Sequence, residues 1–153
     1  MSKPKAKRQE FIDPESGPVF SARFLLTLVL AVVGIAWIVY YYAVVRVDPI
    51  KGGKPGGPGF MADWGNWNYL IGFGLLFLGL AIAAHPSTPL GRGQGIVVGM
   101  LGCFILGLLW IVTFYVVSNN ITSIPVMNDL GQKNLFVGIV MMGIGFIYAT
   151  KWE

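Results

Sequence analysis

Long apolar runs without a formal charge constrain this chain more than any other feature of its sequence. Two of them, residues 24–45 and 96–117, contain 22 residues each, and about 20 residues suffice for a helix to cross the hydrocarbon core of a bilayer. Two shorter runs, 69–84 and 135–150, contain 16 residues each. They become long enough when the preceding asparagine and interfacial neighbours are counted. The sequence therefore predicts an all-α polytopic membrane protein with four transmembrane helices. The predicted spans cover about residues 24–45, 68–84, 96–117 and 134–150.

The low content of charged residues supports this class and argues against catalysis. Only 12% of the residues are charged, whereas a soluble domain carries about 25%. None of the four runs contains Asp, Glu, Lys, Arg or His, although an ionisable group within the membrane usually marks a pump, transporter or protease. The sequence shows no nucleophile–base pair, metal-ligand spacing or phosphate-binding loop. We therefore expect no enzymatic activity, no cofactor and no metal site.

The distribution of lysine and arginine predicts that both termini are cytoplasmic. Loops on the cytoplasmic side of a membrane carry the excess of these residues, and the side that holds the two termini would carry seven of them against four. The first run is not expected to be a cleavable signal peptide, because its apolar core exceeds the usual length of about 7 to 15 residues.

Residues 1–23 form a basic tail whose function the sequence leaves open. The tail would be attracted to anionic lipid by about 1 kcal/mol per basic residue near the surface. Docking on an acidic cytoplasmic protein is the alternative, and nucleic acid is not an expected target of so short a patch. The basic residues concerned are Lys3, Lys5, Lys7 and Arg8.

Two stretches with similar sequences indicate that the chain is a tandem duplication. MADWGNWNY at 61–69 and MNDLGQKNL at 127–135 lie 66 residues apart, and each precedes a glycine-rich apolar run. GIAWIV at 34–39 corresponds in the same way to GLLWIV at 107–112. Each copy is a two-span hairpin, so both copies share one orientation, as parallel repeats do. The predicted units are the tail 1–23, the first hairpin 24–84, a cytoplasmic linker 85–95 and the second hairpin 96–153.

The repeated stretch has both a structural and a functional interpretation. Asn68 and Asn134 are expected to be N-caps of the spans that follow them. Trp64, Trp67 and Tyr69 suit the water–lipid interface, but the same residues would also form a partner-binding surface outside the membrane. The second copy lacks these aromatic residues, so such a surface would belong to the first copy.

Glycines spaced seven residues apart lie on one stripe of each predicted second span. Small residues on one face allow two helices to approach closely in a membrane. The helices concerned belong either to this chain or to a partner protein, and self-association is left open. The third predicted span has small residues at four-residue steps, Gly95, Gly99, Cys103 and Gly107. With these glycines and the residues of the repeated stretch, the candidate partner-binding set is Trp64, Trp67, Asn68, Tyr69, Gly72, Gly79, Gly95, Gly99, Gly107, Gly138 and Gly145.

The basic tail, the tryptophan in the first span and the sequence MADWGNWNYLIGFGLLFLGL together resemble the CrgA family of actinobacterial septation proteins. Residues 65–69, Gly-Asn-Trp-Asn-Tyr, carry the most specific part of the resemblance. It covers the chain twice, more closely in residues 24–84 than in 96–152. Usual members of the family are single hairpins with cytoplasmic ends, so the duplication is a departure from the family's pattern.

The resemblance implies a non-enzymatic membrane component of the division machinery that coordinates or restrains septum formation. The implied partners are the tubulin-like ring protein FtsZ and septal peptidoglycan-synthesis proteins such as FtsI and FtsQ. The implied location is the cell membrane at the division septum. The alternatives are a small four-span transporter or channel, or a regulator of another membrane complex.

Overall fold

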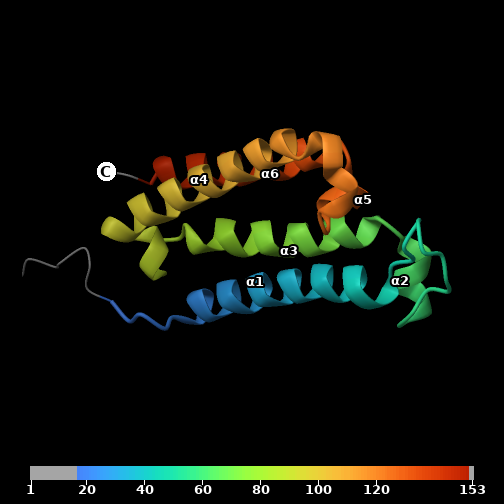
Figure 1. The fold of residues 1–153 in the computed structure, drawn as a ribbon. Helices are drawn as coiled ribbons and strands as arrows, with labels where there is room; N and C mark the ends of the chain where they lie inside the picture. Colours follow the sequence, from blue (N-terminus) through green and yellow to red (C-terminus); the bar gives the residue numbers. More distant parts are fainter. Residues whose placement is uncertain (1–16, 152–153) are drawn as a thin grey trace, which may run out of the picture.

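The computed structural model describes residues 17–151, and this part of the chain is helical, without a β-strand. The basic residues of the tail, Lys3 to Arg8, lie outside the described residues. Four long helices form the body of the molecule and two short helices lie at one of its ends (Figure 1). The long helices are α1 (Ala22–Tyr40), α3 (Trp67–Ala83), α4 (Gln94–Val116) and α6 (Lys133–Ala149), and the short ones are α2 (Gly59–Trp64) and α5 (Met127–Leu130).

The long helices coincide with the predicted spans. A π-helical turn, Tyr41–Val45, extends α1, and with it each long helix begins and ends within two residues of its predicted bounds. Two of the helices are long and apolar enough to cross a membrane, namely Ala22–Val45 with 24 residues and α4 with 23. The other two, α3 and α6, are apolar but contain only 17 residues each. The prediction of an all-helical fold is confirmed.

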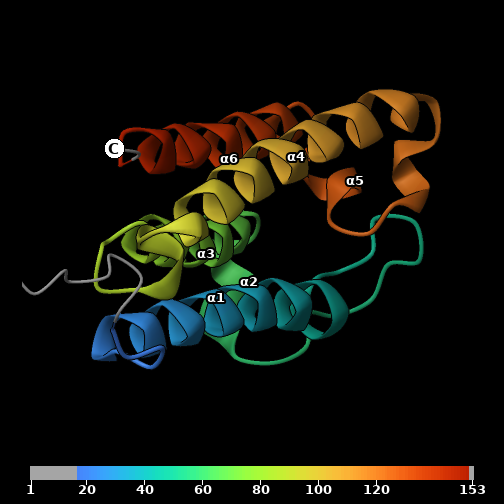
Figure 2. The same ribbon diagram turned by 90° about the vertical axis from the view of Figure 1, so that its left-hand side faces the viewer.

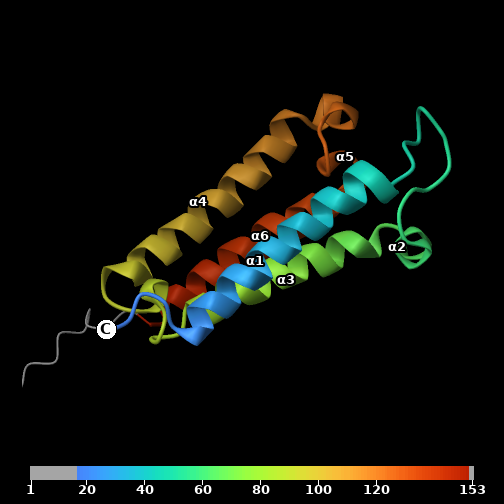
Figure 3. The same cartoon turned by 90° about the horizontal axis from the view of Figure 1, so that it is seen from below.

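The helices form two antiparallel hairpins, α1 with α3 and α4 with α6. Figure 2 shows α1 and α3 as one pair and α4 and α6 as the other. The short helices α2 and α5 lie at one end of the bundle, which we call the α2/α5 end (Figures 1 and 3). The connection between the hairpins lies at the opposite end, where the described chain also begins and ends.

Glycines let the helices of each hairpin touch through their backbones, and they do so at equivalent positions. A Cβ atom on Gly34 would lie 2.5 Å from the carbonyl oxygen of Gly72, and one on Gly107 would lie 2.7 Å from that of Gly138. Real Cβ atoms do not approach so closely, and a backbone oxygen cannot move aside as a flexible side chain can. Each hairpin therefore depends on a glycine pair where its helices cross.

A second close contact between helices also occurs in both hairpins, nearer the segment that links the two hairpins. A Cβ on Gly79 would lie 3.0 Å from the carbonyl oxygen of Thr27, and one on Gly145 would lie 3.2 Å from that of Met100. Thr27 and Met100 are separated by the same 73 residues as Gly34 and Gly107. The duplication seen in the sequence is thus a duplication of helix packing.

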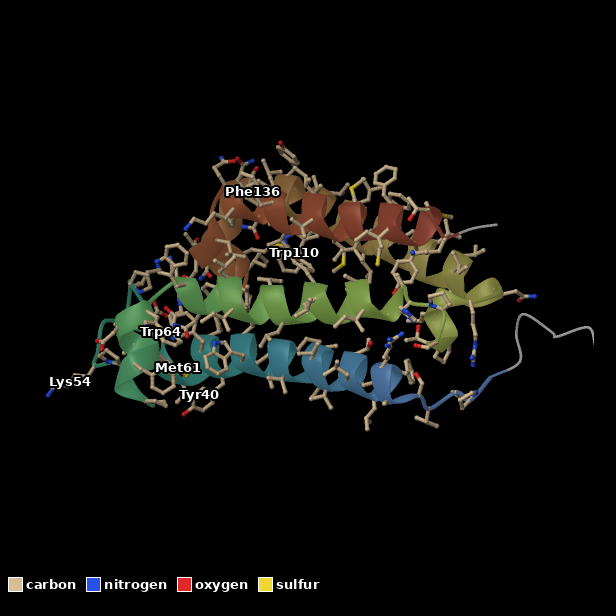
Figure 4. The ribbon with its side chains drawn as sticks, turned by 180° about the vertical axis from the view of Figure 1, so that it is seen from behind. Tyr40, Lys54, Met61, Trp64, Trp110 and Phe136 are labelled. Carbon is tan, nitrogen blue, oxygen red and sulfur yellow. The ribbon has the colours of Figure 1, made fainter. Side chains whose placement is uncertain are left out.

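The hairpins contact each other through α3, which packs on α6 and on part of α4. Phe73 of α3 lies edge-on to Trp110 of α4, with 5.7 Å between the ring centres. Figure 4 shows Trp110 on the side of the second hairpin that faces α3. Near the opposite end of the bundle, the Tyr148 hydroxyl donates a hydrogen bond of 2.9 Å to the carbonyl oxygen of Leu80. These contacts hold the two copies together along one seam.

Candidate functional site

The repeated stretch folds into the same hydrogen-bonded clamp in both copies. Asn68 lies in the first turn of α3, fully buried, and its Nδ2 donates to the carbonyl oxygens of Met61 (2.7 Å) and Gly65 (2.8 Å). Both hydrogens of the side-chain amide are thereby used. They bind two carbonyl groups at the end of α2, of which that of Gly65 also accepts from the backbone amide of Asn68.

The second copy repeats this arrangement. Asn134 is also fully buried, and its Nδ2 donates to the carbonyl oxygens of Met127 (2.9 Å) and Gly131 (2.8 Å). We call each set of Met, Gly and Asn an asparagine clamp. The clamp ties a short helix to the long helix that follows it, so the repeated stretch is first of all a structural element.

The prediction that Asn68 and Asn134 are N-caps is wrong. The positions that precede α3 and α6 are Asn66 and Gln132, and neither makes a side-chain capping bond. Asn68 and Asn134 lie inside their helices and donate to carbonyl groups, whereas an N-cap accepts from amide groups. The sequence pattern located the right residues but assigned them to the wrong end of a helix.

Glycine is required at the centre of each clamp. Gly65 has φ and ψ angles of 51° and −131°, and Gly131 has 50° and −128°. L-amino acids with a side chain rarely adopt this conformation because the Cβ atom would clash with the backbone. The turn reverses the chain between short and long helix and brings the asparagine within reach of the carbonyl groups.

The two clamps differ in the indole that faces them. In the first copy Trp37 Nε1 donates to Oδ1 of Asn68 at 3.2 Å. In the second copy the corresponding atoms, Trp110 Nε1 and Asn134 Oδ1, are buried and have no hydrogen-bond partner among the described residues. Trp110 instead packs against Phe73 of the first hairpin. In the second copy the indole thus packs on the first hairpin and forms no hydrogen bond to the clamp asparagine.

An ion pair joins the copies at the α2/α5 end. Arg46, just after α1 and its π-helical turn, pairs through Nε with the Asp129 carboxylate, and both side chains are about 10% exposed. The Tyr69 hydroxyl donates to the same carboxylate oxygen at 2.7 Å. Asp129 belongs to the second copy, whereas Arg46 and Tyr69 belong to the first. A single carboxylate thus binds two groups of the other hairpin, and we call this set of three residues the junction.

Local electrostatics favour the charged arginine at the junction. The hydrogen bond to Asp129 raises the pKa of Arg46 above its ordinary value, and this effect exceeds the opposing effect of burial. The guanidinium carbon also lies 4.8 Å from the centre of the Tyr42 ring, which suits a cation–π contact. A polar cavity of about 390 Å³ adjoins the pair and is lined partly by Arg46, Asp129 and Asn66.

The aromatic residues of the first copy do not form one surface. Trp67 and Trp64 are 70% and 45% exposed. Trp64, which Figure 4 shows at the α2/α5 end, packs edge-on against Phe60. Tyr69 is only 1% exposed because it points into the junction. The expectation that Tyr69 lies at the water–lipid interface is wrong, and the exposed part of the patch consists of the two tryptophans.

Most of the candidate glycines face the chain's own helices. Gly72, Gly79, Gly138 and Gly145 line the hairpin contacts described above, together with Gly107. Partner binding by these glycines stays a prediction, and a partner would have to compete with contacts inside the hairpins.

Two candidate glycines near the start of α4 have other neighbours. A Cβ on Gly99 would lie 2.3 Å from the Tyr148 ring, so Gly99 accommodates an aromatic side chain of α6. A Cβ on Gly95 would lie against the carbonyl group of Pro89 in the connecting segment. Gly95 therefore serves the turn between the hairpins rather than a helix face.

The connection between the hairpins is a structured turn. Thr88 is fully buried, and its hydroxyl donates to the carbonyl oxygens of Ala83 and His85 and accepts from the amide of Gly91 at 3.1 Å. Arg92 reaches back and donates at 2.8 Å to the carbonyl oxygen of Gly17. The segment thus fixes the start of α4 relative to the end of α3.

Of the three junction residues, the sequence singled out Tyr69 but neither Arg46 nor Asp129. Arg46 had a detectable signal, since it is the first charge after a run of 22 uncharged residues. Asp129 had none, because Asp63 occupies the same place in the first copy and is exposed. Among the described residues, no three His, Cys, Asp or Glu side chains lie close enough to hold a metal ion. The arrangement of these residues serves to hold helices together and to present a surface.

Comparison with known proteins places both hairpins in one family. The family model described as cell division protein CrgA matches residues 2–85 and again residues 91–153. The protein named cell division protein CrgA of Streptomyces avermitilis is 36% identical over 67 residues, which are 44% of this chain and 75% of that protein. The protein of the same name from Corynebacterium glutamicum strain R is 45% identical over 49 residues.

The match with the Corynebacterium glutamicum protein covers 32% of this chain and 43% of that protein, so the chain spans less than half of this relative's length. A third relative of the same name, from Corynebacterium aurimucosum, is 40% identical over 54 residues, 35% of this chain and 56% of that protein. No solved structure matches the chain.

Proposed function

The chain belongs to the family of the cell division protein CrgA, and from this premise we propose that it is a multi-pass membrane component of the bacterial division machinery. It acts by contacting other proteins and not by catalysis. The double match of the family model carries the proposal, since residues 2–85 and 91–153 each contain one complete hairpin. Relatives named cell division proteins support the same role.

We also propose that all four long helices cross the membrane. Each 17-residue helix extends over about 25 Å, close to the roughly 30 Å of a hydrocarbon core. Each packs against a longer apolar helix through the glycine contacts, so it lies in the same layer as a helix that is long enough to cross. The α2/α5 end then faces outward and both termini face the cytoplasm, as the distribution of lysine and arginine predicts.

Cysteine labelling in intact cells tests this topology. Single cysteines replace Asp63 and Asn119 at the α2/α5 end and Ser87 at the other end, in a Cys103→Ala background. We expect a membrane-impermeant maleimide to label the first two in intact cells and Ser87→Cys only after permeabilisation. Labelling of Ser87→Cys in intact cells, or protection of Asp63→Cys and Asn119→Cys, would contradict the four-span arrangement.

The proposed partners are proteins of the septum. The family suggests the tubulin-like ring protein on the cytoplasmic side and peptidoglycan-synthesis proteins in the membrane. The exposed Trp64 and Trp67 offer an outward aromatic surface. Such a surface suits protein contacts, because large aromatic rings bury much area and lose little side-chain entropy on binding. The basic tail offers a surface to an acidic cytoplasmic partner. These assignments refine the family's role and rest on it.

Localisation in dividing cells tests the division role. A fluorescently tagged full-length protein is expected to form a band at the septum, and a version that ends at residue 90 shows which hairpin carries the targeting information. A band for both would assign targeting to the first hairpin. A band for the full chain alone would make the tandem pair the functional unit. A uniform envelope signal for both would contradict the division role and favour a transporter or channel.

A further inference from the structure

An apolar groove between α3 and α6 runs along the seam of the two hairpins. It has a volume of about 560 Å³, and its floor and walls include Leu70, Phe73 and Gly74 of α3 and Phe136 and Val140 of α6. A Cβ atom on Gly74 would meet nothing within 4 Å, so this part of the floor is open. Neither hairpin alone would form this groove.

The groove is polar at one end only. Trp67 and Lys133, the first residues of α3 and α6, line it at the α2/α5 end together with Asn66. Lys133 is exposed and, within residues 17–151, forms no salt bridge with an acidic side chain. The positive ends of two helix dipoles also lie at this end. A ligand that fits the groove therefore combines an apolar body with a negatively charged end group.

The length of the groove selects among such ligands. Its lining on α3 extends from Trp67 to Phe77, a distance of about 15 Å along the helix axis. This is half of the roughly 30 Å thickness of a hydrocarbon core, which is the depth of one leaflet. One acyl chain beneath a charged end group matches both the length of the groove and its single polar end.

We propose that this groove is a binding site for one anionic phospholipid of the outer leaflet. The phosphate lies at the Lys133 ammonium group, and one acyl chain lies along Leu70, Phe73 and Gly74. The site rests on the four-span arrangement proposed above, because only that arrangement places Lys133 at the outer interface.

Native mass spectrometry of the purified full-length protein tests the site. The probes are phosphatidylglycerol and phosphatidylcholine with identical acyl chains. We expect one phosphatidylglycerol to be retained per chain, and Lys133→Gln to weaken its retention about fivefold, as one lysine near a lipid surface would. Lys54→Gln, in the loop before α2, is the matched control and should leave retention unchanged.

A second variant tests the apolar part independently of charge. Gly74→Leu fills the groove without meeting another atom at Cβ, and Gly102→Leu introduces the same side chain into open space on α4. We expect Gly74→Leu to lose retention of both lipids and Gly102→Leu to keep it, with equal helical content by circular dichroism.

Three results would overturn the site. The first is equal retention of phosphatidylglycerol and phosphatidylcholine by the unmodified protein. The second is equal retention of phosphatidylglycerol by Gly74→Leu and Gly102→Leu. The third is that the unmodified protein retains no lipid and forms a dimer that Gly74→Leu abolishes. The last would mean that a second copy occupies the groove. Loss of lipid with a normal septal band would refute neither the division role nor the topology, and lipid retention without a septal band would contradict the division role alone.

Discussion

The two hairpins share their internal construction and differ in how they contact each other. Both cross at a glycine pair, Gly34 with Gly72 and Gly107 with Gly138, and both close with an asparagine clamp. Within residues 17–151 the ion pair has no equivalent in the other copy. Asp129 binds Arg46, whereas Asp63 is exposed, and the residue that corresponds to Arg46 in the second copy is Asn119.

This difference separates what a hairpin needs from what joins two hairpins. Glycine contacts and clamps satisfy requirements that every such hairpin has, namely close packing without a hydrophobic drive and satisfied carbonyl groups at a helix end. The junction and the contact between Phe73 and Trp110 are found only where the copies meet. Equivalent substitutions at shared features should therefore destabilise both copies alike. Substitutions at the junction should destabilise the protein, whereas substitutions at the equivalent positions Asp63 and Asn119 should not.

The largest expected effect is at the glycine pairs. Gly34→Leu and Gly107→Leu would each press a side chain against a backbone oxygen, so each should lower the free energy of unfolding by about 3 kcal/mol, the upper end for overpacking. Unfolding in mixed micelles, followed by circular dichroism, measures both. Gly102→Leu, which meets open space, should change stability by less than about 0.5 kcal/mol. Equal losses in all three variants would refute the packing account.

The clamps come next and should differ slightly. Asn68→Ala removes three side-chain hydrogen bonds and should cost about 2 kcal/mol, because the Met61 carbonyl and the Trp37 indole lose a partner while the Gly65 carbonyl keeps the backbone amide of residue 68. Asn134→Ala removes two and should cost about 1 kcal/mol less. The same unfolding titration compares them, with the exposed Asn119→Ala as control. If Asn134→Ala lowered the free energy of unfolding more than Asn68→Ala, the hydrogen bond between Trp37 and Asn68 would not contribute to stability.

The smallest effect concerns the two indoles. Trp37→Phe removes a hydrogen bond to Asn68, whereas Trp110→Phe removes a donor that has no partner among the described residues. Both lose similar apolar area, so the difference in unfolding free energy should be about 1 kcal/mol, with Trp37→Phe the more destabilised. Equal values for the two variants would show that the first copy does not use the bond.

The sequence predicted the parts of the fold that depend on local pattern. Uncharged apolar length located the four long helices within two residues, and seven-residue glycine spacing located the helix contacts. The tandem duplication was visible because MADWGNWNY and MNDLGQKNL keep the residues that a clamp requires. These features depend on neighbours in sequence or on helix periodicity, which a single sequence displays directly.

The remaining features depend on geometry that the sequence does not display. The pattern predicts an N-cap at Asn68 because the sequence does not display the positive φ angle of Gly65, which turns the chain just before it. Tyr69 was assigned to the interface because its partner Asp129 lies in the other copy. Nothing in the sequence distinguishes Asp129 from Asp63, since only the packing of one hairpin on the other places Arg46 next to one of them. Such contacts need the tertiary arrangement.

A double-mutant cycle tests most directly the claim that the copies are built alike but that only one of their two equivalent aspartates forms an ion pair with the other copy. Unfolding free energies are measured for Arg46→Gln, Asp129→Asn and the double variant, and in parallel for Asn119→Ala, Asp63→Asn and their double variant. The account predicts a coupling of about 2 kcal/mol for the first pair and none for the second. A coupling below about 0.5 kcal/mol for Arg46 and Asp129, or an equal coupling for both pairs, would contradict it.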